Sequence, residues 1–398
     1  MGMELETIQA LDQQHFMNVF GQRIPVCFTR GEGVTLYDTK GKPYLDLFAG
    51  IAVNALGYNH PVWTREMCSY LTDHVVHTSN IYYVETQAKL AQKLTELTCA
   101  DRVYFANSGA EANECAIKLA KIYQYKKGRL EKNKVITLCN SFHGRTLATV
   151  AATGQPKYQA PYQPLTPGFI HVPLNDFKAL EQAADDTVCA VMLEPIQGES
   201  GVYPADREYL NKIRALCSQK DMLLIFDEVQ TGVGRTGHWY AYQHFGVEPD
   251  VFTTAKALGN GIPISACCAK EFAASAFSPG DHGGTFGGNG FACQSGLTVL
   301  DCIQKENLLD NARETGAYFK QELEKLAQQT EHISEIRGVG LMLGIQTDCA
   351  KVYQIKLFEQ GFLVGTAGGN TLRLVPPLIF SKENAKEFLS AFSQIINE

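Results

Sequence analysis

Two residues with reactive side chains stand where predicted strands end. Lys256 follows the β-branched run at 250–255 and precedes a stretch of small residues, and Asp227 follows the apolar run at 222–226. Ligands of open α/β sheets bind at the carboxyl ends of strands, so both side chains could face one ligand. A lysine amine can attack a carbonyl carbon there once its pKa is lowered. Taken alone, Lys256 is better explained as a solvated loop cation and Asp227 as a turn cap.

A helix entrance near residue 108 could bind an anion. Ser108 and Glu111 have the spacing of a capping box and follow the predicted strand at 102–107. The apolar residues that come next recur at helical spacing. The backbone N–H groups at Ser108 and Gly109 are therefore placed to receive a phosphate, although an ordinary capped helix has the same pattern.

Three further loops carry polar side chains at strand ends. The stretch NSFHGRT at 140–146 supplies an aromatic ring, an imidazole and a guanidinium in Phe142, His143 and Arg145. The other loops are EPIQGESGV at 194–202, with Glu194 and Glu199, and HGGTFGGNG at 282–290, where glycines surround Thr285. The sequence contains no P-loop motif and no G-x-G-x-x-G after a strand, which argues against a nucleotide-phosphate enzyme.

These residues need a scaffold of alternating strands and helices. From about residue 61 to 270, short apolar runs alternate with stretches of helix length, as in parallel strands that are covered on both faces. The predicted strands are 102–107, 134–139, 188–195, 222–228, 250–255 and 263–269, and one predicted helix is 206–220. We therefore expect the α/β class, with a mainly parallel, doubly wound sheet and helices on both faces.

The chain after residue 290 has a different pattern. We expect a long helix at about 305–329, a strand at 338–345, two more near 362 and 371, and a final helix from 382. This order indicates a smaller α+β domain. The predicted division is an N-terminal segment (1–60) that packs with the small domain, a large α/β domain (61–290) and the small C-terminal domain (291–398).

Composition argues against several classes of protein. Of the 398 residues 45% are hydrophobic and 19% are charged, and a net charge of -7 gives no basic field for nucleic acid or anionic lipid. The twelve cysteines include no C-x-x-C pair, which argues against a metal site or disulfides and favours free thiols. There is neither a signal peptide nor an apolar run of membrane-spanning length. We expect a cytoplasmic protein whose partners are small molecules.

Together these residues match the needs of pyridoxal phosphate. A lysine must react with its aldehyde, a carboxylate must keep its ring nitrogen protonated, and helix N-terminal amides must hold its phosphate. Lys256, Asp227 and Ser108 offer these groups. Nine motifs follow one another along the chain: DLFAGIAVNALGYNHP, NSGAEANE, FHGRT, EPIQGESGV, FDEVQTGVGRTG, AKALGNGIPISA, HGGTFGGN, IRGVGLMLGI and LRLVPPL. With these motifs, in this order, the sequence from about residue 20 onward resembles class III aminotransferases of fold type I, and most of all their acetylornithine group.

The resemblance implies a role for each site residue and a seven-stranded sheet. Lys256 would bond to the cofactor and act as general base, and Asp227 would pair with the pyridine nitrogen. The residues implied to bind the cofactor are Ser108, Gly109, Ala110, Phe142, Asp227, Glu228, Val229, Gln230, Lys256 and Thr285. Thr285 would reach the cofactor of the neighbouring subunit, which implies a homodimer with active sites at its interface. The residues implied to bind substrate are Arg145, Gly284, Glu199 and Arg373.

The resemblance also implies a reaction. The δ-amino group of N2-acetyl-L-ornithine would pass to 2-oxoglutarate, giving N-acetyl-L-glutamate 5-semialdehyde and L-glutamate, a step of arginine biosynthesis. Such a site must accept an ω-amine and then an α-amino acid. Arg373 would pair with Glu199 in the first half-reaction and open to a carboxylate in the second. The alternatives are a class III enzyme for succinylornithine, succinyldiaminopimelate, ornithine or 4-aminobutyrate, and a pyridoxal-phosphate-dependent aminomutase.

Three positions depart from the family pattern. Gly284 stands where acetylornithine enzymes commonly have a serine that contacts substrate. Ile51 stands where enzymes for free ornithine usually have a tyrosine, which favours an acylated ornithine. Asn260 interrupts the usual glycine run after the lysine, at a place where asparagine tolerates a left-handed backbone.

Overall fold

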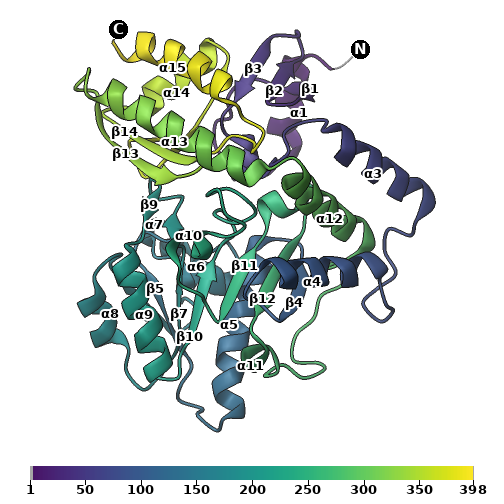
Figure 1. Cartoon of the computed structure of the whole chain (residues 1–398), viewed down its shortest axis with the longest axis vertical. Coiled ribbons are helices and arrows are strands. Elements are labelled where there is room, and N and C mark those ends of the chain that lie inside the picture. Colours follow the sequence, from purple (N-terminus) through teal and green to yellow (C-terminus); the bar gives the residue numbers. More distant parts are fainter. Residues whose placement is uncertain (1–2, 398) are drawn as a thin grey trace.

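A seven-stranded sheet forms the centre of the larger part of the molecule (Figure 1). The computed structural model describes residues 3–397. The strand order is β4 (Arg102–Ala106), β12 (Ser265–Ala269), β11 (Val251–Thr254), β10 (Leu223–Asp227), β7 (Val188–Leu193), β5 (Lys134–Leu138) and β6 (Phe169–Val172). β12 is antiparallel to both of its neighbours, and all other neighbouring strands are parallel. The mainly parallel sheet is therefore confirmed.

Helices cover both faces of this sheet because successive strand residues point to opposite sides. In β10, Ile225 packs with the apolar face of α5 (Gly109–Lys126), whereas Phe226 shares a core with α9 (Arg207–Gln219). The other helices of this part are α3 (Pro61–Asp73), α4 (Glu85–Leu97), α6 (Leu147–Ala152), α7 (Pro156–Gln159), α8 (Phe177–Ala183), α10 (Ala241–Phe245), α11 (Glu271–Ala274) and α12 (Gly290–Lys305). Short elements are β8 (Ile196–Gln197), β9 (Tyr203–Pro204) and the 3-10 turns η1 (Ala160–Tyr162) and η2 (Lys256–Gly259).

The second part of the molecule combines both ends of the chain (Figure 1). One four-stranded sheet has the order β1 (Phe28–Glu32), β2 (Thr35–Asp38), β3 (Pro43–Asp46) and β15 (Phe362–Leu363). Another has the order β13 (Ile333–Val339), β14 (Met342–Thr347), β17 (Thr371–Leu374) and β16 (Gly365–Ala367). The helices here are α1 (Leu5–His15), the short turn α2 (Ala49–Ala52), α13 (Leu308–Ala327), α14 (Ala350–Glu359) and α15 (Lys382–Ile396). Because β15 pairs with β3, the N-terminal strands share a sheet with a C-terminal one.

Three elements differ from the sequence predictions. The single strand expected at 338–345 was wrong: β13 and β14 form an antiparallel hairpin that turns at Gly340, whose φ of 58° suits glycine. The helix expected at 305–329 is present as α13, but α12 precedes it and was not predicted. Asn307 separates the two helices with a left-handed φ of 53°. The edge strand β6 was also missed, since FIHV is short and contains a histidine.

All twelve cysteines are free, and most of them are buried, whereas Cys68 and Cys349 are exposed. No helix within residues 3–397 is long and apolar enough to cross a membrane.

Candidate active site

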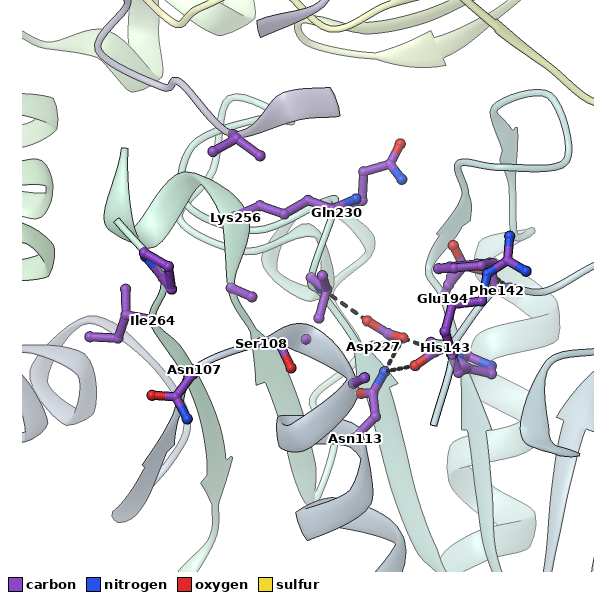
Figure 2. A pocket seen from close by; sticks show the side chains of 18 of the residues that line it. Asn107, Ser108, Asn113, Phe142, His143, Glu194, Asp227, Gln230, Lys256 and Ile264 are labelled. Atoms are coloured by element: carbon purple, nitrogen blue, oxygen red, sulfur yellow. Dashed lines mark hydrogen bonds and ion pairs between the residues drawn. The ribbon is translucent and has the colours of Figure 1, made fainter. Parts of the chain in front are cut away.

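A cavity of about 390 Å³ lies where β4, β10 and β11 end at their carboxyl termini (Figure 2). Nine of the residues to which the family resemblance gives a role line it: Ser108, Gly109, Ala110, Phe142, Arg145, Asp227, Val229, Gln230 and Lys256. The rest of the lining includes Val53, Asn107, Asn113, His143, Glu194 and the apolar residues Ile262, Pro263 and Ile264. Its size and its mixture of apolar walls with a few polar groups are those of a small-molecule site.

Lys256 begins the turn η2 directly after β11, and its backbone φ is 44°. Such a φ is uncommon outside glycine and redirects the chain at the strand end. The side chain lies across the cavity towards Gln230 (Figure 2). Burial lowers the pKa of its amine to about 8; the charge of Glu199 opposes this effect, and that of Arg373 adds to it. A much larger fraction of the amine than in a solvated lysine is therefore neutral, and nucleophilic, near neutral pH.

Asn260 ends the Lys256 turn. Its φ is 45°, so the left-handed backbone expected from the sequence is confirmed. Its side chain also has a function that the sequence did not predict. The Asn260 Oδ1 atom accepts the N–H of Leu56 at 2.9 Å. The turn that carries the lysine is thus bonded to the N-terminal segment.

Asp227 closes β10 with its carboxylate held by three hydrogen bonds. Asn113 Nδ2 donates to Oδ2 at 2.8 Å, His143 Nδ1 lies 2.8 Å from the same oxygen, and the Val229 N–H donates to Oδ1 at 3.1 Å. Asn113 cannot flip its amide, because it also donates to the His143 carbonyl and accepts from Thr253 Oγ1. This buried carboxylate is therefore oriented and able to face a cationic ring nitrogen in the cavity.

The start of α5 forms a cradle for an anion. Ser108 is the N-cap, and its Oγ accepts the Glu111 N–H at 3.3 Å. Gly109 and Ala110 follow as the first helical residues, whose N–H groups have no acceptor inside the helix. A Cβ on Gly109 would lie 2.7 Å from a methyl group of Val229, so only glycine fits this close approach. The expected N-cap and helix are confirmed.

Phe142 lies across the cavity from Ser108 (Figure 2), and Arg145 also lines the cavity. The Phe142 N–H donates to Glu194 Oε2 at 2.9 Å. Burial raises the pKa of Glu194 to about 7, so this carboxyl can hold or release a proton near neutrality. The exposed Arg145 guanidinium lies 3.8 Å from the ring centre of Tyr158 and 5.4 Å from that of Phe142.

An ion pair between a buried arginine and a partly exposed glutamate adjoins the cavity through Gln230. Arg373, on β17, places its NH1 atom 2.5 Å from Glu199 Oε1 and donates to Gln230 Oε1 at 3.1 Å. Gln230 Nε2 donates to Glu199 at 3.3 Å, which closes a ring of three side chains. Burial alone would raise the pKa of Glu199, but the charge of Arg373 and these bonds hold it below its usual value. Glu199 is therefore ionised and neutralises Arg373.

Five implied site residues do not line the cavity of the single chain: Glu199 and Arg373, which adjoin it through Gln230, and Glu228, Gly284 and Thr285. Glu228 is buried on another side of β10, where its carboxylate accepts the N–H groups of Ala241 and Tyr242 at 2.8 and 2.7 Å. Gly284 and Thr285 are exposed on the loop before α12. The Gly284 carbonyl accepts a bond from Asn80 Nδ2 at 3.0 Å.

Sequence reasoning missed two parts of the cavity. Asn113 could have been suspected, because it is a polar residue beside the apolar face of α5. No local signal marks Val53, whose place in the cavity wall depends on how the whole N-terminal segment folds back.

Comparisons with known proteins agree with this geometry. Residues 16–396 match the family model described as aminotransferase class III. The chain belongs to this family. The acetylornithine aminotransferase of Methanocaldococcus jannaschii is 46% identical to the enzyme, over 98% of this chain and 97% of that protein. That of Gloeobacter violaceus is 48% identical over 96% of each chain.

Solved structures of aminotransferases share the fold of this class III enzyme. A crystal structure of the ornithine aminotransferase from Toxoplasma gondii matches with a TM-score of 0.95 at 32% identity, over 100% of this chain and 96% of that one. The acetylornithine aminotransferase from Elizabethkingia anophelis matches with a TM-score of 0.88 at 34% identity, over 100% of each chain.

Class III aminotransferases depend on pyridoxal phosphate, and the residues of this enzyme fit that cofactor. The start of α5 offers amides without a helical acceptor to a phosphate. Because Gly109 has no side chain, it leaves room for Val229 to pack against the start of the helix. Asp227 offers a fixed carboxylate, and Lys256 an amine with a lowered pKa. The buried Nε2 of His143 has no hydrogen-bond partner among the described residues, so the cavity also leaves a polar atom for a ligand.

Proposed function

We propose that the enzyme transfers the δ-amino group of N2-acetyl-L-ornithine to 2-oxoglutarate, releasing N-acetyl-L-glutamate 5-semialdehyde and L-glutamate. The observation that carries this proposal is the sequence identity of 46% and 48%, over 98% and 96% of this chain, to the two acetylornithine aminotransferases named above. The site supports it, since it offers a nucleophilic amine, one guanidinium at the cavity and a second beside it.

We assign the cofactor groups to residues of the cavity. Pyridoxal phosphate, when bound, supplies an aldehyde that takes up the amino group and a protonated ring that accepts electron density. Ser108, Gly109 and Ala110 would hold its phosphate, and Phe142 and Val229 would enclose its ring. Asp227 would keep the ring nitrogen protonated. Lys256 would bond to the aldehyde and, once released, move a proton as general base, for which a pKa of about 8 is suited.

Arg373 and Glu199 would adapt the site to two different substrates. An acylated ornithine presents an ω-amine and no carboxylate at this place, so the pair stays closed and Arg373 stays neutralised. 2-Oxoglutarate presents a carboxylate, which displaces Glu199 from Arg373. Because Gln230 bonds to both partners, it can support either arrangement. Arg145, exposed at the cavity, would bind the distal carboxylate of each substrate.

We propose a homodimer in which the loop around Thr285 completes the neighbouring site. Gly284 and Thr285 are exposed in the single chain. Asn80 bonds this loop to a segment whose apolar side chains are open, with Ile81 84% and Tyr82 68% exposed. Exposed apolar groups that lie together mark an interaction surface, and a second subunit would cover them. Sedimentation should give twice the mass of the chain.

We also propose that the enzyme works in the cytoplasm. Its twelve free cysteines, including Cys267 and Cys268 side by side in the core, suit a compartment that keeps thiols reduced.

A panel of amine donors with 2-oxoglutarate tests the proposed substrate, because specificity is expressed in kcat/KM. We expect acetylornithine to exceed free ornithine, succinyldiaminopimelate and 4-aminobutyrate. Equal values for acetylornithine and ornithine would refute the choice of donor. Product formation without any 2-oxoglutarate would instead indicate an aminomutase.

A further inference from the structure

The segment after β3 contains a strained left-handed turn beside the active site. Residues 49–52 all have positive φ, from 49° at Ala49 to 70° at Ile51. Gly50 alone among them adopts such a backbone without steric cost, because a Cβ crowds the following carbonyl oxygen in a left-handed helix. Strained backbone persists only where the surrounding structure holds it, and it gathers at functional sites.

The carboxylate of Asp46 holds the entrance of this turn. Its side chain accepts the Phe48 N–H at 2.8 Å and the Ala49 N–H at 3.0 Å, and these are the amides at which the left-handed backbone begins. The Tyr58 hydroxyl donates to its second oxygen at 2.6 Å. Asp46 is only 1% exposed, so these charge-assisted bonds form in a dry environment.

The turn joins two parts of the active site. On one side, the ring of Phe48 lies 5.5 Å from the Arg373 guanidinium and packs so closely on Gly365 that a Cβ there would be 2.2 Å from the ring. On the other side, Val53 lines the cavity, and Leu56 is bonded to Asn260 at the end of the Lys256 turn. A change in the turn must therefore move the cavity wall relative to Arg373.

We propose that Asp46 is a positioning residue for the amine donor: it holds the left-handed turn, and the turn fixes Phe48 beside Arg373 and Val53 in the cavity wall before substrate binds. The choice of acetylornithine as the donor rests on the proposed function. A merely structural aspartate would affect stability alone. A positioning residue affects the KM of the donor in a protein that still folds.

The test compares Asp46→Asn with Asp38→Asn. Asp38 is a matched control, because its carboxylate also accepts two backbone N–H groups, from Lys40 and Lys42, and a tyrosine hydroxyl, but it lies at the end of β2 and does not line the cavity. For Asp46→Asn we expect the KM for acetylornithine to rise at least about tenfold, as for one lost charge-assisted hydrogen bond. We expect kcat to change by less than about threefold, since Lys256 and Asp227 are retained. A KM within twofold of the Asp38→Asn value overturns the proposal.

Hydrogen exchange and a rescue variant separate strain from other effects. In Asp46→Asn the amides of residues 48–54 should exchange faster, while those of α5 keep the wild-type rate. Ala49→Gly added to Asp46→Asn should restore both the KM and the exchange rates, because glycine adopts the left-handed backbone without help. No restoration overturns the proposal. If Asp46→Asn does not fold, Tyr58→Phe takes its place. This variant removes the hydroxyl that orients the Asp46 carboxylate, and it should also raise the KM for acetylornithine.

Failure of the proposed function has a different signature. If the wild-type enzyme does not use acetylornithine, the KM values of Asp46→Asn and Asp38→Asn are compared for the amine donor that it does use. The exchange measurement needs no donor, so unchanged exchange at 48–54 in Asp46→Asn refutes the positioning role whichever substrate is correct.

Discussion

Replacing Glu199 by glutamine tests the arginine switch, because glutamine keeps the shape and removes the charge that pairs with Arg373. The Arg373 side chain is 3% exposed and that of Glu199 27% exposed. Removing one partner of a fully buried pair costs about 3–5 kcal/mol. Because Glu199 is partly open to solvent, which screens the remaining cation, we reduce this cost to about 2 kcal/mol.

This cost enters only one half-reaction. In the variant, bound acetylornithine excludes water from Arg373 without supplying a carboxylate, so kcat/KM for this donor should fall by about 30-fold, the factor that corresponds to about 2 kcal/mol. 2-Oxoglutarate brings its own carboxylate and need not displace Glu199 in the variant. The rate of that half-reaction should therefore stay within about threefold of wild type or increase.

Stopped-flow absorbance of the cofactor measures the two half-reactions separately. Glu335→Gln is the matched control, because Glu335 pairs with Arg337, whose side chain is 5% exposed, and neither residue lines the cavity. An equal loss in both half-reactions of Glu199→Gln would refute the switch. A similar loss in Glu335→Gln would mean that both variants act by destabilising the sheet that contains β13 and β17.

Three further predictions concern the Lys256 turn and its surroundings. Burial lowers the pKa of Lys256 to about 8, so the folded apoenzyme binds fewer protons than the unfolded chain above that pH. Its free energy of unfolding should rise between pH about 8 and about 10, and Lys256→Met should abolish both this gain and turnover, as denaturant titrations and assays can check. Glu228→Gln should lower the free energy of unfolding by about 1–3 kcal/mol, because its carboxylate accepts the first amides of α10. The cofactor absorbance should remain, and its loss would contradict the placement of Glu228 outside the cavity. Asn260→Ala should cost more stability than Asn260→Gly, because alanine loses the Leu56 bond and also strains the left-handed backbone; equal losses in thermal unfolding would contradict this reason.

The sequence predicted the central sheet well because its strands are continuous apolar runs that end at polar residues. The strands β4, β5 and β10 lie within the predicted ranges, and Ser108 and Asp227 meet because parallel strands end at the same edge. Periodicity carries no strand direction, so the antiparallel setting of β12 could not be predicted. It also could not separate β13 from β14, since GVGLMLGI is apolar on both sides of the turn at Gly340.

The side chains that hold the site together were harder to predict, because their partners are far apart in the sequence. Only the family resemblance paired Arg373 with Glu199, 174 residues away, and nothing in the sequence indicated the bond between Asn260 and an amide 204 residues away. A local pattern reports propensity and burial, whereas these bonds depend on how the two ends of the chain fold against the large sheet. The stretch around Lys256 therefore looked like a solvated loop in isolation. Its left-handed lysine and asparagine become understandable only once the N-terminal segment is in place, because that segment supplies the Leu56 amide that fixes the turn.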